Sequence, residues 1–427
     1  MRVLVVGSGG REHAIIRSLA RSPEITALYC APGNAGIACD AVCLPVSATD
    51  IDGMARAARD NDIDFAVVAP DDPLVMGMTD RLEAEGVPCF GPHADAAIIE
   101  GSKAFSKALM KKYGIPTADY EVFDSPQAAL GYIKERNRYP AVVKADGLAL
   151  GKGVVIAQSE EEAAAALRSI MEDKVFGESG NKVVVEEFLT GPEVSVLAFT
   201  DGRTIRPMVS SMDHKRALDG DNGLNTGGMG TVAPNPFYTE EIADECMRRI
   251  FLPTVRAMCG EGRPFRGCLY FGLMLTPDGP KVIEYNCRFG DPETQVVLPL
   301  LETDLFSIMR AVSEERLAEL DIRWRDGAAA CVIAASGGYP VKYKKGCVIH
   351  GLDEHGQRPD AEIFHAGTAR ENGEFVTAGG RVLGAACTAP TLKEALAGAY
   401  AAMDGIDFEG KHCRRDIGRR ALGARSE

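Results

Sequence analysis

Two lysines flank a glycine-rich turn in the segment VVKADGLALGKGVV, which runs from Val142 to Val155. The segment predicts two strands joined by a tight turn, and such a flap can close over a polyphosphate because glycine lets a ligand approach the backbone. It is not a P-loop, because it joins two strands and because Gly153 stands where a P-loop carries a hydroxyl for magnesium. We expect phosphate contacts from Lys144, Gly147, Gly151, Lys152 and Gly153.

A second nucleotide signal lies where the strand predicted over Val183–Glu187 ends. Backbone groups that leave a strand can pair with the edge of an adenine, and a carboxylate a few residues later can accept both ribose hydroxyls. An acidic strand end that is merely solvated is the alternative interpretation. The nucleotide interpretation predicts contacts from Glu186, Glu187, Phe188, Leu189 and Glu193.

Glu284 and Asn286 stand two residues apart on a predicted strand, so both side chains point to one face. Two oxygen ligands suit Mg²⁺, which takes few protein ligands and completes its octahedron with phosphate and water. A charged turn follows directly, in which Arg288 could bind a small carboxylate through two hydrogen bonds beside Asp291. A surface turn held by salt bridges is the alternative.

The polar, glycine-rich loop predicted at 213–230 combines an acid, cations and free backbone amides. Long loops inside compact domains are usually functional, and a mobile lid that orders over phosphates fits this one. We expect site residues at Asp213, Lys215, Asn225, Thr226 and Gly227.

The sequence GSGGREH at 7–13 predicts a glycine turn between a strand and a helix, which aims backbone amides at an anion. A dinucleotide site requires a third glycine where Glu12 stands, and an acid at the end of the second strand, which reads Tyr29 to Pro32. A simple phosphate site therefore competes with a turn that binds nothing. Candidates at this edge of the sheet are Gly9, Gly10, Arg11, Asn34 and Asp71. For the aspartate, capping of the helix expected near Leu74 is the alternative.

Three units would position these residues. Residues 1–101 alternate short apolar strands with helices, which predicts a Rossmann-like domain with a parallel sheet. Residues 102–325 mix helices with antiparallel strands, with one continuous helix over 240–259, and 326–427 form a small strand-rich C-terminal α/β domain. The predicted fold class is α/β and α+β multidomain.

Composition restricts the class of protein further. The chain has 427 residues, with 47 basic and 61 acidic side chains, and the difference of −14 disfavours binding to nucleic acid. Twelve cysteines without a CxxC pair indicate reduced thiols and a cytoplasmic protein. The short N-terminal apolar run predicts a buried strand, not a signal peptide, and no apolar run reaches the ~20 residues of a membrane helix.

Taken together, the flap, the strand exit at 186–193 and the Glu284-x-Asn286 pair resemble the ATP-grasp superfamily. Within it the chain is similar to the glycinamide ribonucleotide synthetases, a family of phosphoribosylamine–glycine ligases. The similarity covers nearly the full length and rests on GSGGREH, APGNAG, KADGLALGKGV, DHKR, NTGGMG, NCRFGDPETQ, GGYP, FHAGT and GGRVL.

The resemblance implies an ATP-dependent carbon–nitrogen ligase of purine biosynthesis that joins glycine to 5-phosphoribosylamine through a glycyl phosphate. It implies that 1–101 bind the sugar substrate and that 121–190 form a mobile lobe over the nucleotide. Lys107, Lys144 and Lys152 would hold phosphates, and Glu284 and Asn286 would bind Mg²⁺ or Mn²⁺. Catalytic roles fall to Asp213 for the glycine ammonium, Arg288 for the glycine carboxylate, and Lys215. The implied protein is a cytoplasmic monomer or weak homodimer that binds neither nucleic acid nor membrane.

One position departs from the family pattern, since Ala69-Pro70-Asp71 replaces Gly-Pro-Glu and shortens a carboxylate by one methylene.

Three other functions remain as alternatives: another ATP-grasp ligase, a nicotinamide-dependent oxidoreductase, and a non-catalytic nucleotide-binding regulator. The Arg288 turn disfavours the first, Glu12 disfavours the second, and the set of Glu284, Asn286 and Arg288 disfavours the third.

Overall fold

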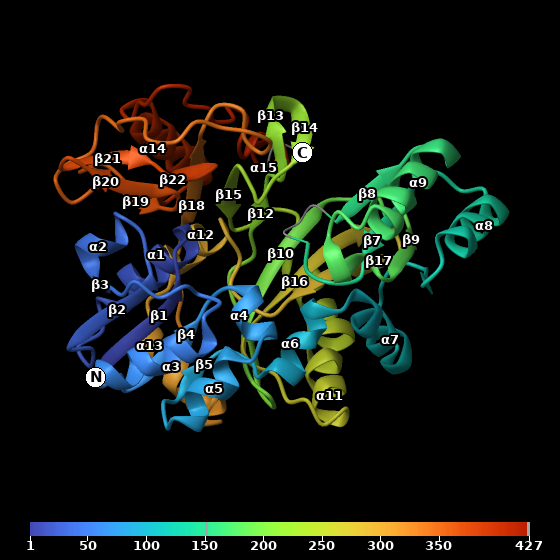
Figure 1. Ribbon diagram of the computed structural model, residues 1–427, viewed down its shortest axis with the longest axis horizontal. Helices are drawn as coiled ribbons and strands as arrows, with labels where there is room; N and C mark the ends of the chain where they lie inside the picture. Colours follow the sequence, from blue (N-terminus) through green and yellow to red (C-terminus); the bar gives the residue numbers. More distant parts are fainter. Residues whose placement is uncertain (150–152, 425–427) are drawn as a thin grey trace.

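The structure is a computed structural model that describes residues 1–149 and 153–424. Its N-terminal part folds around a parallel sheet with the strand order β3-β2-β1-β4-β5 (Figure 1). Strand β1 is buried from Val3 onward, because helices cover both faces of the sheet. The Rossmann-like prediction is thereby confirmed. The elements are β1 (Arg2–Gly7), α1 (Gly10–Leu19), β2 (Ala27–Pro32), α2 (Ile37–Asp40), β3 (Val42–Cys43), α3 (Ile51–Asp60), β4 (Phe65–Val68), α4 (Asp71–Val75), α5 (Met78–Ala84), β5 (Cys89–Phe90) and α6 (Ala94–Gly101).

The helix expected to begin near Leu74 is two helices, α4 and α5. They separate at Gly77, whose φ of +87° is a left-handed conformation that glycine adopts without strain. Helix α4 begins at Asp71 with Pro70 as its N-cap, so the capping alternative for this aspartate is wrong. The Asp71 side chain is therefore available to the site.

A small lobe with its own hydrophobic core projects from the body at the right of Figure 1. Its antiparallel sheet has the order β6-β9-β7-β8, and Lys144 at the end of β7 lies opposite Val154 at the start of β8. The predicted hairpin is confirmed. The elements are α7 (Lys103–Tyr113), which leads into the lobe, β6 (Tyr120–Phe123), α8 (Pro126–Arg136), β7 (Ala141–Ala145), β8 (Val154–Ala157), α9 (Glu160–Leu167) and β9 (Val183–Glu187).

A larger antiparallel sheet, ordered β11-β10-β16-β17, lies beside the lobe; Glu193 is the first residue of β10 and Asn286 is the last residue of β17. The helix predicted over 240–259 is interrupted by a π-helical turn at Met247–Phe251. The elements are β10 (Glu193–Asp201), β11 (Ile205–Pro207), α10 (Glu240–Cys246), α11 (Leu252–Gly260), β16 (Arg266–Thr276), β17 (Gly279–Asn286), α12 (Thr294–Val297) and α13 (Leu305–Ser313).

The C-terminal sheet, ordered β12-β15-β18-β22-β19, incorporates two strands from the central part of the chain. The loop predicted at 213–230 is consequently wrong in part: β12 and β15 flank it, and β13 pairs with β14 as a hairpin inside it. The elements are β12 (Met212–Asp213), β13 (Arg216–Leu218), β14 (Asn222–Asn225), β15 (Gly230–Ala233), β18 (Ala328–Ala335), β19 (Glu362–His365), β20 (Thr368–Glu371), β21 (Glu374–Thr377), β22 (Arg381–Ala389), α14 (Leu392–Asp404) and α15 (Arg419–Gly423).

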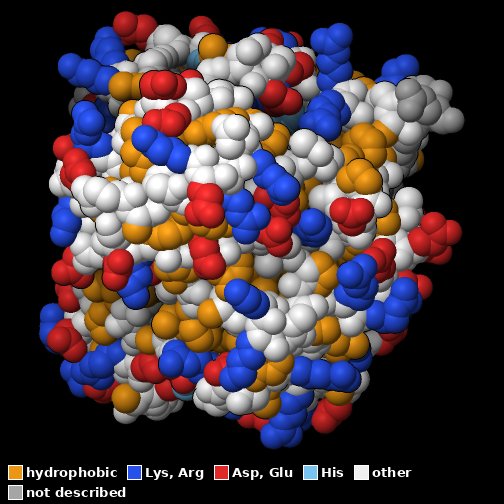
Figure 2. Space-filling model, turned by 90° about the vertical axis from the view of Figure 1, so that its right-hand side faces the viewer, with side chains coloured by type: hydrophobic (Ala, Val, Ile, Leu, Met, Phe, Trp, Pro, Cys, Tyr) orange, Lys and Arg blue, Asp and Glu red, His pale blue; other side chains and the backbone are white. Residues whose placement is uncertain are grey.

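The outer face of the lobe side carries basic and acidic side chains interspersed with one another (Figure 2). Within residues 1–149 and 153–424, no helix combines the length and apolar character needed to cross a membrane.

Candidate functional site

A cavity of about 760 Å³ is bordered by residues of the lobe, the central sheet and the C-terminal sheet, and its size is typical of small-molecule sites. It brings together most of the residues predicted from the sequence, although they come from remote parts of the chain. Those that line it are Arg11, Asp71, Lys107, Lys144, Gly153, Glu186, Glu187, Phe188, Leu189, Glu193, Asp213, Lys215, Asn225, Thr226, Gly227, Glu284, Asn286, Arg288 and Asp291.

Four predicted residues do not line this cavity: Gly9, Gly10, Asn34 and Gly147. Gly147 still belongs to the flap, because its carbonyl accepts a hydrogen bond from Lys103 Nζ at 3.0 Å. Gly151 and Lys152 lie outside the described residues.

The end of the cavity that is predicted to hold phosphates contains two lysines that share one carboxylate. Lys107 Nζ and Lys144 Nζ each lie 3.0 Å from Glu186 Oε2, and all three side chains are at most 5% exposed. Burial lowers the pKa of Lys107 to about 8, although the Glu186 carboxylate opposes that effect. The second carboxylate oxygen of Glu186 is buried without a hydrogen-bond partner. A polyanion placed here would meet two cations held in fixed positions.

Lys215 links the strand exit to the predicted metal ligands, since its Nζ lies 3.5 Å from both Glu193 Oε2 and Glu284 Oε1. The charge of Glu193 is the largest influence on this lysine and raises its pKa well above the ordinary value. Glu193 itself is half exposed, and Phe188 is 40% exposed at the cavity wall. An accessible aromatic ring and an accessible carboxylate are what stacking on a base and binding of ribose hydroxyls require.

Glu284 and Asn286 face the cavity from β17, as their spacing predicts. Burial alone would raise the pKa of Glu284, but the charges of Lys215, Lys144, Lys103 and Arg288 together lower it, which keeps the carboxylate ionised. Among the described residues, no group of three or more His, Cys, Asp or Glu side chains is arranged to hold a metal ion. One carboxylate and one amide oxygen fit a cation that takes its other ligands from phosphate and water, which is the habit of Mg²⁺.

The guanidinium of Arg288 contacts the carboxylates of Glu100 and Asp71 and the side-chain amide of Asn286. Its Nη2 lies 3.3 Å from Glu100 Oε1, 3.9 Å from Asp71 Oδ2 and 3.1 Å from the amide oxygen of Asn286. Its Nε is buried without a partner in the structure. A guanidinium oriented by neighbours and still holding an unused donor can bind a carboxylate.

Asp213 is a partly buried acid at the end of β12 that lines the cavity. Burial and the neighbouring Glu293 raise the pKa of Asp213 well above its ordinary value, while Lys215 opposes them. Its Oδ1 accepts a hydrogen bond from the His214 amide at 2.7 Å. An ammonium ion brought next to this carboxyl would favour its ionised form, so Asp213 suits the binding of a small cation.

In the N-terminal glycine turn, the backbone amide of Gly9 is hydrogen-bonded to a side chain of the same segment. The Gly9 N–H donates to Glu12 Oε2 at 2.5 Å, and Arg11 Nε donates to Glu12 Oε1 at 2.5 Å. A side chain at Gly7 would collide with Glu12, because its Cβ would lie 2.5 Å from Glu12 Cγ. Glu12, which stands where the dinucleotide pattern requires a glycine, therefore occupies the space inside the turn.

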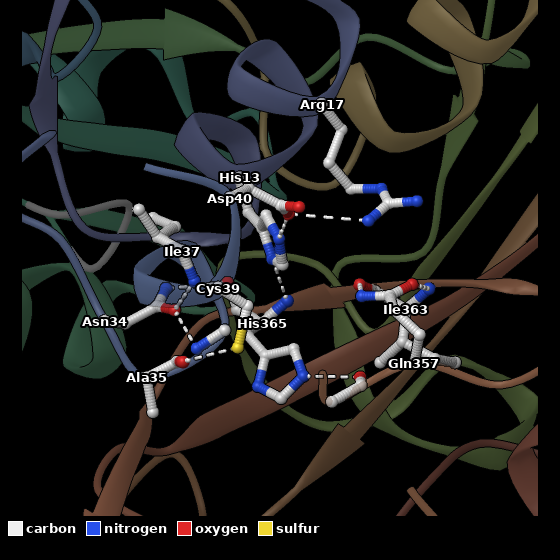
Figure 3. Close-up of polar contacts among 12 residues, drawn as sticks. His13, Arg17, Asn34, Ala35, Ile37, Cys39, Asp40, Gln357, Ile363 and His365 are labelled. Carbon is white, nitrogen blue, oxygen red and sulfur yellow. Dashed lines mark hydrogen bonds and ion pairs between the residues drawn. The ribbon is translucent and has the colours of Figure 1, made fainter. Parts of the chain in front are cut away.

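The side-chain amide of Asn34 is fully hydrogen-bonded to backbone groups, and Figure 3 shows its place beside Ile37 and His365. Its Nδ2 donates to Ser8 O and His365 O at 2.8 and 2.9 Å, and its Oδ1 accepts from the amides of Gly36 and Ile37 at 2.9 Å. The amide thus joins both glycine loops to the C-terminal sheet. A direct contact between this side chain and a substrate would require that these bonds break.

The cavity residues that the sequence does not predict include Glu100, Lys103 and Arg381. Glu100 orients Arg288, and Lys103 contributes another cation, whose pKa is lowered by partial burial. Arg381 lies in the motif GGRVL, which was noted for its resemblance alone. The GGRVL motif could have indicated Arg381, whereas Glu100 and Lys103 lie in helices α6 and α7, which carry no motif.

A small four-stranded lobe beside a larger antiparallel sheet, with lysines and the predicted metal ligands Glu284 and Asn286 at the cavity, is the arrangement of an ATP-grasp enzyme. Family models described as the ATP-grasp (A), N and C domains of phosphoribosylglycinamide synthetase match residues 101–294, 1–100 and 329–420. The chain belongs to the phosphoribosylglycinamide synthetase family.

Named relatives agree with this assignment. Phosphoribosylamine–glycine ligase of Caldanaerobacter subterraneus subsp. tengcongensis is 48% identical over 98% of this chain and 99% of its own. The ligase of Halalkalibacterium halodurans is 47% identical over 100% and 98%. A crystal structure of the Thermotoga maritima ligase matches with a TM-score of 0.86 at 34% identity, covering 97% of this chain and 100% of that one.

Proposed function

We propose that this chain joins glycine to 5-phosphoribosylamine at the expense of ATP, forming glycinamide ribonucleotide, ADP and phosphate. The observation that carries the proposal is one cavity with two kinds of anion site. Lys107 and Lys144 suit a polyphosphate, and Arg288, beside Glu284 and Asn286, suits a small carboxylate. A ligase that activates a carboxylate with ATP needs both sites within reach of each other.

The first chemical step transfers the γ-phosphoryl group of ATP to a carboxylate oxygen of glycine. Arg288 would bind that carboxylate and Asp213 would bind the glycine ammonium, which together turn one oxygen toward the phosphorus atom. Lys107 and Lys144 would hold the transferring phosphates. Glu284 and Asn286 would hold Mg²⁺ or Mn²⁺, and the bound cation supplies positive charge to the phosphoryl oxygens.

In the second step the amine of phosphoribosylamine attacks the carbonyl carbon of the glycyl phosphate. The new C–N bond forms, the C–O bond to phosphate breaks, and inorganic phosphate leaves. Lys215, between Glu193 and Glu284, would stabilise charge on the departing phosphate. The sugar phosphate is assigned to the N-terminal sheet edge, where Arg11 and Asp71 line the cavity.

The division into a substrate domain at 1–101, an ATP-grasp domain at 102–325 with a mobile lobe at 121–190, and a C-terminal domain at 326–427 belongs to this proposal. Two strands of the C-terminal sheet, β12 and β15, come from the middle unit, so the last two units share a sheet. We further propose a cytoplasmic enzyme that is a monomer or weak homodimer.

Phosphate release tests the proposal directly. With ATP and Mg²⁺, release should require glycine and should rise strongly when phosphoribosylamine is generated in the assay from ribose 5-phosphate and ammonia. Glycinamide ribonucleotide should accumulate, one for each phosphate. Release that is indifferent to both glycine and the sugar amine would exclude the ligase function.

A further inference from the structure

Arg381, the first residue of β22, extends from the C-terminal sheet into the cavity. Its Nη1 donates to the carbonyl of Gly227 at 2.7 Å and to the carbonyl of Asp291 at 2.8 Å, and its Nη2 lies 3.2 Å from Asp291 Oδ2. One guanidinium thereby joins two loops that are far apart in sequence. The side chain is 19% exposed, so these contacts are largely shielded from water.

The contact is specific to the shape of arginine. Its planar fork reaches two carbonyls and a carboxylate at once, whereas a lysine ammonium is a point charge that cannot replace that geometry. Gly227 is fitted to the fork, because a Cβ at this position would lie 2.9 Å from the guanidinium carbon. Tyr339, also from the C-terminal domain, accepts the Gly227 amide hydrogen at 3.2 Å.

The two loops carry substrate positions of the proposed reaction. Gly228 packs against the acid of the site, since a Cβ there would lie 2.6 Å from Asp213 Oδ1 and 2.4 Å from Pro292 Cδ. Burial would raise the pKa of Asp291, but Arg381 and Arg11 lower it and keep this carboxylate charged. The guanidinium therefore fixes the Asp213 side of the cavity relative to the turn that carries Arg288.

We propose that Arg381 is a positioning residue for the second step, and that it holds the two loops so that the sugar amine reaches the glycyl phosphate before water does. This inference rests on the proposed function. When the loops separate, water attacks the carbonyl carbon, the C–O bond to phosphate breaks, and glycine and phosphate are released. The net reaction is then ATP hydrolysis without ligation.

The experiment measures the ratio of phosphate released to glycinamide ribonucleotide formed, together with the KM of each substrate, in the full chain. Arg381→Lys keeps the charge and Arg381→Ala removes the side chain, while Arg370→Lys on the exposed hairpin β20–β21 is the matched control. Because a misplacement of about 1 Å can cost a factor of about 100, we expect the KM of phosphoribosylamine to rise at least about tenfold. The ratio should rise from about one to well above one, with the KM of ATP nearly unchanged.

Free guanidinium added to Arg381→Ala should lower the ratio again, which a general loss of folding would not show. If the alanine variant does not fold, the lysine variant decides the question. A ratio that stays at one in the lysine variant, or a KM for ATP that rises as much as that for the sugar amine, overturns the inference. If the wild-type chain shows no glycine-dependent release of phosphate, the proposed ligase function is wrong. That result is distinct from a failure of the inference about Arg381, which shows only in the variants.

Discussion

The pKa of Lys107 predicts how ATP binding depends on pH. The side chain is 2% exposed, and burial lowers its pKa from 10.5 to about 8. At about 1.4 kcal/mol for each pKa unit, the difference of about 2.5 corresponds to about 3 kcal/mol in favour of the neutral amine. Raising the pH through about 8 therefore removes a positive charge from the proposed phosphate site of the free protein, so the affinity for ATP should fall.

The expected magnitude follows from the fraction of Lys107 that is protonated. With a pKa of about 8, that fraction falls to about one tenth at pH 9, so the dissociation constant for ATP should rise about tenfold relative to pH 7. Isothermal titration calorimetry with ATP, in the absence of glycine, measures this dissociation constant. Binding near pH 8.5 should also take up a proton, since phosphate favours the charged lysine, and buffers of different ionisation enthalpy detect this uptake.

Two variants assign the effect to this lysine. Lys107→Arg carries a guanidinium that stays protonated, so its affinity for ATP should be constant across the same range. Lys111→Arg, an exposed neighbour on α7, should keep the wild-type profile. Affinity that does not change between pH 7 and 9, or a fall that survives in Lys107→Arg, would refute the reasoning.

Three further predictions concern other parts of the site. Arg288→Ala should raise the KM for glycine at least about tenfold more than the KM for ATP, because a bidentate contact to the carboxylate is lost, and equal changes in steady-state assays would refute that role. Glu284→Gln should weaken Mn²⁺ binding in the presence of ADP about tenfold or more, as followed by the electron paramagnetic resonance of the ion, and unchanged binding would remove this residue from the metal site. Asn34→Asp should lower the free energy of unfolding by about 2–4 kcal/mol, because it places a carboxylate against two carbonyls, and urea denaturation at an unchanged midpoint would contradict the bonding described.

Local patterns predicted the parts of the site that lie within one element. The flap was predictable because apolar runs on both sides of a glycine turn dictate a hairpin, and Lys144 lies next to the last residue of the first strand. Glu284 and Asn286 share a face because strand residues two positions apart must do so. Their roles in binding remain predictions, whereas their places in the cavity follow from the fold.

Contacts between remote segments could not be predicted in this way. Nothing near Glu100 in the sequence indicates that its carboxylate meets Arg288 across the sheet edge. Asn34 was expected to contact substrate, but its amide joins loops whose proximity depends on the C-terminal sheet. The polar composition of 213–230 predicts a mobile loop, yet β13 pairs with β14 inside this segment, and the pairing of β15 with β18 fixes its end at Gly230.

Transfer of an oxygen atom from glycine to phosphate tests the central claim most directly. Glycine labelled with ¹⁸O in both carboxylate oxygens is incubated with the chain, ATP, Mg²⁺ and phosphoribosylamine, and the released phosphate is analysed by mass spectrometry. If the carboxylate takes the γ-phosphoryl group and the amine displaces it, each phosphate carries one ¹⁸O atom from glycine. Unlabelled phosphate accompanying formation of glycinamide ribonucleotide would contradict a glycyl phosphate and the arrangement of Arg288, Lys107 and Lys144 proposed to form it.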